Sequence, residues 1–137
     1  MIQNKIYRVN AVDAKKIVQE TRSETILHLV ELDGKEIQSW DDYYKEVEMG
    51  FQFPTISINY DAYHDWITDL DWIGKEGYVL IIYDYNSFLE QDSSLKKLIM
   101  EDFADSILPW WQGDVESSVV NCVVGGKAKP FNVYLVD

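Results

Sequence analysis

The sequence predicts an α/β fold in which helices flank a largely parallel β-sheet. Three observations carry this prediction: a continuous apolar run at residues 78–83, a strand-like alternation at residues 24–32, and helical periodicity in the segments between them. A continuous apolar run is typical of a strand buried on both faces. Helices between consecutive strands favour parallel pairing, because a parallel connection must return to the same end of the sheet. From residue 24 the expected order is strand, helix, helix, strand, helix, strand.

The first predicted strand spans residues 24–32 and ends at an Asp33-Gly34 turn. A short helix is expected from Trp40 to Val47. Ser39 is a favourable N-cap for it, because a serine hydroxyl accepts a hydrogen bond from a backbone N–H that has no partner within the helix.

A second helix is expected over residues 59–72, with Asn59 as its N-cap. The apolar run at residues 78–83 follows as the central strand. The next helix begins at Asp92 or Ser93 and should stop or kink just before Pro109, because a proline ring clashes with the carbonyl one turn earlier. Phe131 to Val136 is predicted to form the final strand.

Two segments fall outside this order. Residues 118–124, followed by Gly125-Gly126, predict an extra strand and a turn that would form a C-terminal hairpin. Cys122 lies in that strand and is interpreted as a small buried hydrophobic residue. Residues 1–23 differ from the rest in charge and contain a predicted helix at residues 11–20. We interpret residues 1–23 as an N-terminal extension of unknown role and residues 24–137 as the main domain.

Composition and charge exclude several classes of protein. The chain has 137 residues, of which 47% are hydrophobic, and one cysteine, so it predicts a folded domain without an internal disulfide. No apolar run is long enough to span a membrane, and the N-terminus lacks the apolar segment of a secretory signal. We expect a cytoplasmic protein. The net charge is −12, which repels nucleic acid and anionic membranes and attracts basic partners.

The negative charge is concentrated in one part of the chain. Residues 39–74 carry eight acidic side chains and one basic side chain, Lys45. On the helix predicted over residues 59–72, the apolar face is formed by Ala62, Tyr63, Trp66, Ile67 and Leu70. The opposite face is formed by Asp61, His64, Asp65, Thr68 and Asp69. Asp61 and Asp65 lie one turn apart, where like charges repel, and no lysine or arginine compensates them within the helix. The missing positive charge is expected to come from another molecule.

The chain resembles the barstar family of intracellular ribonuclease inhibitors over roughly residues 24–137. The residues that carry the resemblance are Asp33-Gly34, Phe53-Pro54, Asn59-x-Asp61-Ala62-x-x-Asp65-x-x-Thr68-Asp69-Leu70-x-Trp72, the strand Val79 to Ile82, and Phe131 to Leu135. The resemblance implies a small parallel three-stranded sheet flanked by helices, to which this chain would add a C-terminal hairpin strand.

The resemblance also implies a mechanism. In the family, the acidic helix and the loop before it plug the active site of the ribonuclease, and a helix carboxylate occupies the place of a substrate phosphate. Asp65 matches that central carboxylate, Asp61 matches a second acidic contact, and Asn59 matches the asparagine that opens the helix. We expect His64, Thr68 and Asp69 to complete the partner-binding surface.

The chain departs from the family at positions that would face the partner. Residues 55–58 read Thr-Ile-Ser-Ile where the family often has a Tyr-Tyr-Gly run, and His64 replaces a tryptophan. Asp102 and Asp105 are the candidates for an acidic contact from the later helix. The target nuclease is therefore expected to differ from barnase.

The same residues allow other functional hypotheses. Asp61, His64, Asp65 and Asp69 have the helical spacing of metal ligands, but no second ligand pair accompanies them, so no metal or other cofactor is expected. A glycosidase would need its carboxylates in a cleft, and a His64 general base would need a substrate site. The helix could also be a solvated acidic face without a partner. Trp72 lies either beyond the helix end, packed on the core, or exposed beside the acidic face.

We therefore expect an inhibitor that is not an enzyme, is monomeric when free, and occludes the active site of a basic ribonuclease or nuclease toxin. Many such proteins are immunity proteins encoded beside a toxin, in a toxin–antitoxin arrangement. The alternative is an acidic adaptor that binds some other basic protein.

Overall fold

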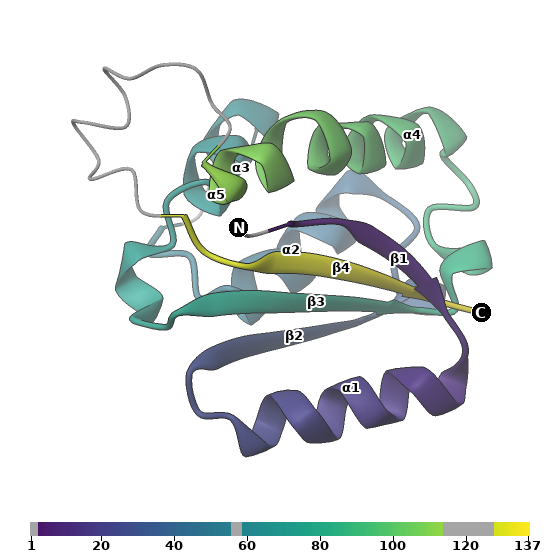
Figure 1. The fold of residues 1–137 in the computed structure, drawn as a ribbon. Coiled ribbons are helices and arrows are strands. Elements are labelled where there is room, and N and C mark those ends of the chain that lie inside the picture. The colour runs from purple at the N-terminus through teal and green to yellow at the C-terminus, as the bar shows by residue number, and fades with distance from the viewer. Residues whose placement is uncertain (1–2, 56–58, 114–127) are drawn as a thin grey trace.

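The computed structural model describes residues 3–55, 59–113 and 128–137. Within these residues, four strands form one parallel sheet in the order β1-β4-β3-β2 (Figure 1). The strands are β1 (Ile6–Val9), β2 (Leu27–Asp33), β3 (Gly77–Tyr83) and β4 (Phe131–Val136). The helices are α1 (Ala11–Ser23), α2 (Trp40–Gly50), α3 (Tyr60–Ile67), α4 (Ser93–Asp102) and α5 (Leu108–Gln112). The predicted α/β class, with a parallel sheet flanked by helices, is confirmed.

The sheet separates two hydrophobic layers. Helix α1 lies on one face, and α2, α3, α4 and α5 lie on the other (Figure 1). Strand β3 is buried from Gly77 to Ile82, as its continuous apolar run predicted. The larger core lies between the sheet and the four helices, and it positions α3.

Three strands were predicted with different accuracy. Phe131–Val136 has the predicted bounds, and the central strand gains only Gly77. Strand β2 begins at Leu27 rather than at Glu24, because its pairing with β3 begins where Leu27 lies opposite Gly77. The order strand, helix, helix, strand, helix, strand is confirmed from β2 onward, with the last helix divided into α4 and α5.

The first 23 residues contribute to the same sheet. The predicted helix at residues 11–20 is present as α1 and extends to Ser23, with Asn10 as its N-cap. Strand β1 was not predicted, because it is four residues long and has no alternating pattern. It pairs in parallel with β4 at the edge of the sheet. The division between residues 1–23 and 24–137 stays a prediction.

The helix after β3 changes its winding before Pro109. Helix α4 ends at Asp102, a π-helical turn spans Phe103–Ile107, and Pro109 lies in the first turn of α5. The backbone N–H of Leu108 donates to the carbonyl of Phe103, five residues earlier. A wider turn at this point accommodates the proline ring, as the predicted kink required.

Residues 118–126, which were predicted to form a strand and a turn around Cys122, lie outside the described residues. In the part of the chain that is described, no helix is both long enough and apolar enough to cross a bilayer.

The turn after β2 provides a test of the packing. A methyl group on Gly34 would lie 2.5 Å from the backbone carbonyl oxygens of Tyr83 and Asp84, which cannot move without distorting the end of β3. We expect Gly34→Ala to lower the free energy of unfolding by about 1–3 kcal/mol, measured by urea denaturation. The neighbouring substitution Glu36→Ala is exposed and serves as the control; an equal loss in both variants would contradict the steric argument.

Candidate functional site

Helix α3 is held to the core by its apolar side. Tyr63 and Ile67 are fully buried, and the hydroxyl groups of Tyr63 and Tyr43 lie 2.7 Å apart. The ring of Trp40 in α2 contacts Tyr63 edge-on, with the ring centroids 5.6 Å apart. At the end of the helix, the indole N–H of Trp111 in α5 donates to the carbonyl of Ile67 at 3.0 Å. The orientation of α3 is therefore fixed by groups from two other helices.

The N-terminus of α3 is capped as predicted. The side-chain oxygen of Asn59 accepts a hydrogen bond from the backbone N–H of Ala62 at 2.8 Å. This bond satisfies one of the N–H groups that lack a partner within the helix. Asn59 itself is exposed, so its capping role leaves it accessible to a partner.

The helix is shorter than the predicted span of residues 59–72. It ends at Ile67, where the hydroxyl of Thr68 donates to the carbonyl of His64 at 2.7 Å. Leu70 then adopts a left-handed backbone, with φ of 56°, which places its fully buried side chain in the core. The prediction of one continuous helix was wrong, because tertiary packing of Leu70 overrides the helical pattern.

Trp72 lies beyond the end of the helix and packs on the core. Its indole N–H donates to the carbonyl of Phe51 at 2.9 Å, and its ring meets that of Trp66 edge-on, with the centroids 5.3 Å apart. Of the two predicted positions, Trp72 therefore takes the one beyond the helix end and against the core, not the exposed one beside the acidic face.

The acidic side of α3 faces solvent. Asp61 and Asp65 on α3 are exposed, and so is Asp69, which lies in the turn after the helix rather than on the predicted helix face. None of the ion pairs found among the described residues includes these three aspartates. Asp69 also accepts a hydrogen bond from the backbone N–H of Asp71 at 3.2 Å. Burial raises the pKa of Tyr78 to about 12, and the carboxylates of Asp71 and Asp69 add to that shift.

His64 differs from the three aspartates. Its side chain is 32% exposed, and its Nε2 atom lies 3.0 Å from Ser106 Oγ and 3.5 Å from Asp102 Oδ1. Both partners approach the same ring nitrogen, so this is not the arrangement of a catalytic triad, in which the acid and the nucleophile bind opposite nitrogens. His64 links α3 to the π-helical turn, and its contact with a partner stays a prediction.

Asp102 and Asp105 lie in different surroundings. The side chain of Asp102 is 15% exposed and accepts a hydrogen bond from the Tyr60 hydroxyl at 2.8 Å, so it faces α3. Burial raises the pKa of Tyr60, and the hydrogen bond to Asp102 raises it further. Asp105 is exposed. Of the two candidates from the later helix, Asp105 is the one whose side chain is free to meet a partner.

The contacts from Tyr60 and His64 to Asp102 and Ser106 were not predicted. The hydrogen bonds Tyr60–Asp102 and His64–Ser106 each join residues 42 positions apart, and no local pattern in the sequence predicts such a contact. Among residues 3–55, 59–113 and 128–137, no group of three or more His, Cys, Asp or Glu side chains is arranged to hold a metal ion.

Comparison with known proteins identifies the family of this chain. No curated protein matches the chain significantly. The model of one protein family, described as barstar (barnase inhibitor), matches residues 27–123, which is well over half of the chain. The matched region includes all of α3 and its capping residue. Members of that family bind ribonucleases and inhibit them, and they are not themselves enzymes. The chain therefore belongs to the barstar family.

Proposed function

We propose that this protein inhibits a basic ribonuclease or nuclease toxin by inserting the acidic side of α3 into its active site. One observation carries the proposal: Asp61 and Asp65 are exposed on one side of a rigid helix, Asp69 is exposed in the turn that follows it, and none of the three is in an ion pair within the described residues. The family assignment supports a ribonuclease as the partner.

The chemistry of such a target explains the choice of carboxylates. An active site that binds RNA must hold phosphate, and arginine presents the same planar pair of donors to a carboxylate and to a phosphate. Asp61 and Asp65 lie one helical turn apart on α3. They can therefore meet two cationic groups that would otherwise bind the RNA backbone. Asn59, His64, Thr68 and Asp69 border these two residues on the proposed surface.

The rigidity of α3 favours tight binding. Association costs free energy when mobile side chains and loops must become ordered. Here the Tyr43–Tyr63 hydroxyl contact, the Trp111–Ile67 hydrogen bond and the Tyr60–Asp102 hydrogen bond hold the helix before any partner arrives. The binding energy of the carboxylates is then not consumed in ordering the backbone.

The wider role follows from this mechanism. An inhibitor of a nuclease toxin acts as an immunity protein, in the cytoplasm where cellular RNA is exposed, and we propose that it is a monomer when free. Residues of this protein at the edge of the proposed binding surface, including His64, determine which nuclease is recognised.

The direct test is capture of the nuclease from a lysate of the native host. The baits are the wild-type protein, Asp65→Ala, and Glu90→Ala, which removes an exposed carboxylate far from α3 in sequence. We expect wild type and Glu90→Ala, but not Asp65→Ala, to retain a basic protein whose ribonuclease activity is blocked until the complex is dissociated. Retention of a basic protein without ribonuclease activity would support the adaptor alternative and contradict inhibition.

Association should depend steeply on salt. The chain has a net charge of −12. Salt screens exposed charges that are further apart than the Debye length, which is about 10 Å at 0.1 M salt. We expect the association rate constant with the captured nuclease to fall by about tenfold or more as salt is raised from low to physiological concentration, measured by stopped-flow fluorescence. An association rate that does not change with salt would contradict electrostatic steering.

A further inference from the structure

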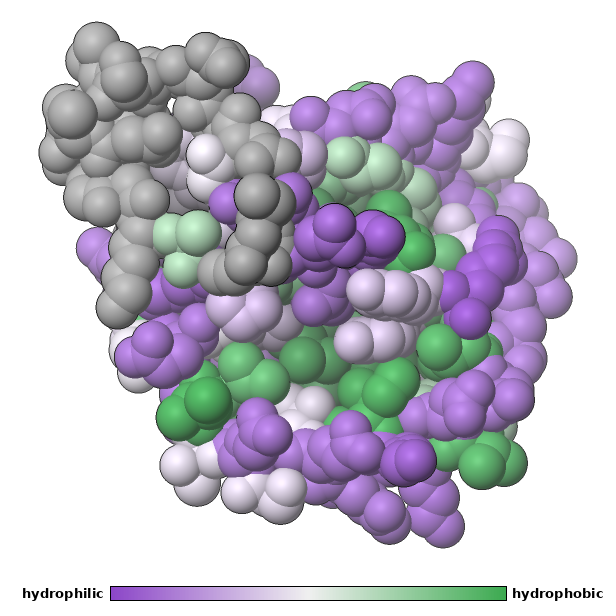
Figure 2. Space-filling view, viewed as in Figure 1, coloured by the Kyte–Doolittle hydropathy of each residue, from purple (hydrophilic) through white to green (hydrophobic). Residues whose placement is uncertain are grey.

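Among the residues that the structure describes, the face of the sheet that carries α1 is only partly covered. All-parallel sheets are normally buried on both faces. Strands lie about 4.8 Å apart, so a four-stranded sheet is wider than one helix, whose diameter is about 10 Å. In the described part of the chain, α1 is the one helix on this face (Figure 1). Figure 2 shows a band of hydrophobic surface between α1 and β1, over the middle strands.

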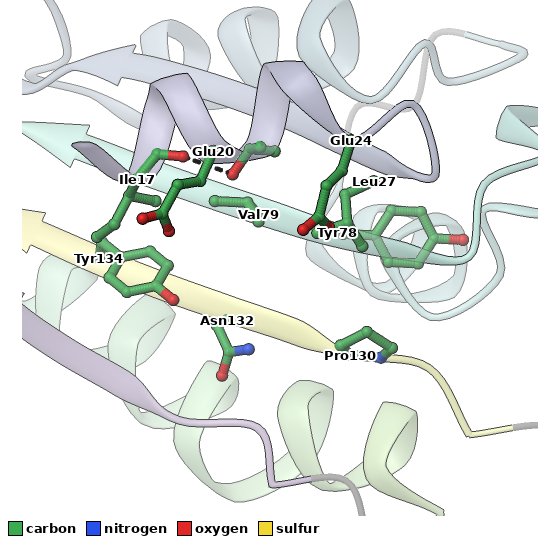
Figure 3. Close-up of a pocket in the computed structure, with 10 residues that line it drawn as sticks. Ile17, Glu20, Glu24, Leu27, Tyr78, Val79, Pro130, Asn132 and Tyr134 are labelled. Atoms are coloured by element: carbon green, nitrogen blue, oxygen red, sulfur yellow. Dashed lines mark hydrogen bonds between the residues drawn. The ribbon is translucent and has the colours of Figure 1, made fainter. Parts of the chain in front are cut away.

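We call this surface the open sheet face and define it by Tyr7, Ile17, Leu27 and Tyr134, which surround the buried Val79. The rings of Tyr7 and Tyr134, on neighbouring strands, stack with their centroids 5.2 Å apart. Tyr7 is 39% exposed, which is high for a large side chain on a parallel sheet. Between the sheet and the C-terminal half of α1 the face deepens into a pocket of about 190 Å³ (Figure 3).

One wall of the open sheet face is acidic. Asp13 and Glu20 fall with Ile17 within about 60° around the axis of α1, and Glu24 is the C-cap of this helix. Of these three acidic residues, Glu20 and Glu24 line the pocket. In Figure 3 the carboxylates of Glu20 and Glu24 point from α1 toward the pocket, above Asn132 and the Tyr134 ring.

The carboxylates of this wall differ from Arg22, which lies on the opposite side of α1. None of the ion pairs among the described residues includes Asp13, Glu20 or Glu24, but Arg22 on the other side of α1 binds Glu31 at 3.0 Å. Burial raises the pKa of Tyr134, and the neighbouring Tyr7 and Glu20 add to that shift, which agrees with the position of Glu20 beside this ring.

We infer that the open sheet face is a second docking surface, which binds a basic amphipathic helix from another polypeptide. The helix would lie beside α1 over β4 and β1, with its apolar side on Tyr7 and Tyr134. Its cationic side chains would meet Glu20 and Glu24, and one of them would enter the pocket. This surface lies on the opposite face of the sheet from α3, so it does not rest on the proposed inhibition of a nuclease (Figure 1).

A helix of opposite charge fits this surface better than a second copy of the chain does. Two copies would bring together molecules of net charge −12 and would place acidic walls against each other. A basic helix instead completes the layer that α1 begins, and it neutralises carboxylates that the fold leaves unpaired.

The test uses a synthetic amphipathic leucine–lysine helix, with a leucine–glutamate helix of the same pattern as its counterpart. Binding to the full-length, isotope-labelled protein is followed by NMR. We expect the leucine–lysine peptide alone to bind and to shift resonances of α1, β1 and β4. Because α3 is also acidic, the titration is repeated with Asp65→Ala, which should bind the peptide at the open sheet face as wild type does.

Matched charge reversals separate the site from general acidity. Glu20→Lys with Glu24→Lys should weaken binding of the peptide by about tenfold or more. Glu36→Lys with Glu90→Lys makes the same change in net charge at two exposed positions elsewhere and should weaken it much less. Tyr7→Ser tests the apolar part and should also weaken binding.

Several results would overturn the proposal. They are shifts centred on α3, equal losses in the two charge-reversed variants, or binding that Tyr7→Ser leaves unchanged. Self-association of the free protein that buries Tyr7 would also overturn the proposal, because a second copy of the chain would then cover the face. So would a Tyr7 side chain that surface labelling cannot reach in the free monomer, because the chain itself would then cover the face.

Discussion

Replacing Asp65 by alanine is expected to remove most of the affinity for the captured nuclease while leaving the fold intact. Truncating one partner of a buried charge pair costs ~2–5 kcal/mol, a range to which measurements on the barnase–barstar complex itself contribute. That cost corresponds to an affinity loss of roughly 30-fold to several thousand-fold. Isothermal titration calorimetry, or inhibition of the nuclease at several inhibitor concentrations, measures it.

The fold should not depend on Asp65. Its side chain is exposed and is in none of the ion pairs found among the described residues. Removing it also relieves repulsion from Asp61 one turn away, so the free energy of unfolding should be unchanged or rise by ~0.2–0.5 kcal/mol. Glu90→Ala serves as the control and should keep full affinity. If Asp65→Ala unfolds the protein, the carboxylate is structural and the binding surface has been assigned wrongly.

A second large effect is expected at alkaline pH. Tyr43, Tyr63 and Tyr78 are buried, and burial raises the pKa of all three hydroxyl groups, that of Tyr78 to about 12. In the unfolded chain a tyrosine ionises near pH 10. Above that pH the unfolded state releases protons that the folded state retains, so the stabilising contribution of these groups is complete below pH 10 and is lost as pH rises toward their folded pKa values.

The size of this effect follows from the number of protons. Each retained proton lowers the free energy of unfolding by about 1.4 kcal/mol per pH unit, so the three tyrosines together give on the order of 4 kcal/mol per pH unit. A domain of this size has a total stability of about 5–15 kcal/mol, so we expect it to unfold cooperatively within a few pH units above 10. Circular dichroism and the ultraviolet absorbance of tyrosinate should change together.

The variant Tyr78→Phe tests the assignment. The Tyr78 hydroxyl is 3.5 Å from the carbonyl of Leu70, a weak hydrogen bond, so its removal should cost little at neutral pH. The dependence of stability on pH above 10 should become shallower by about 1.4 kcal/mol per pH unit. Tyrosinate absorbance that appears in the wild type well before circular dichroism is lost would show that these hydroxyls ionise within the folded protein.

Features set by local chemistry could be predicted from the sequence. Asn59 and Asp92 begin their helices because their side-chain oxygens accept from backbone N–H groups three residues ahead. The run at residues 78–83 is a buried strand because nearly all its side chains are apolar. The exposed positions of Asp61 and Asp65 follow from helical periodicity, since the apolar residues of α3 fix which side faces the core.

Features set by distant parts of the chain could not be predicted. The end of α3 depends on the burial of Leu70, and strand β1 is defined by its pairing with β4, whose residues lie more than 100 positions later. The position of His64 depends on Asp102 and Ser106. A single sequence predicts helical spacing and capping well, but it does not predict which side chains far apart in the sequence contact each other.

The way α3 is fastened has a consequence for how this protein can change over time. Its position is fixed from behind by Tyr43, Tyr63 and Trp111, and none of these contacts uses the exposed carboxylates. Mutations of these exposed carboxylates are therefore expected to be nearly neutral for stability. Under the proposed function, such an inhibitor can follow a diverging target by exchanging exposed residues such as Asp61 and Asp65, while the contacts beneath the helix stay the same.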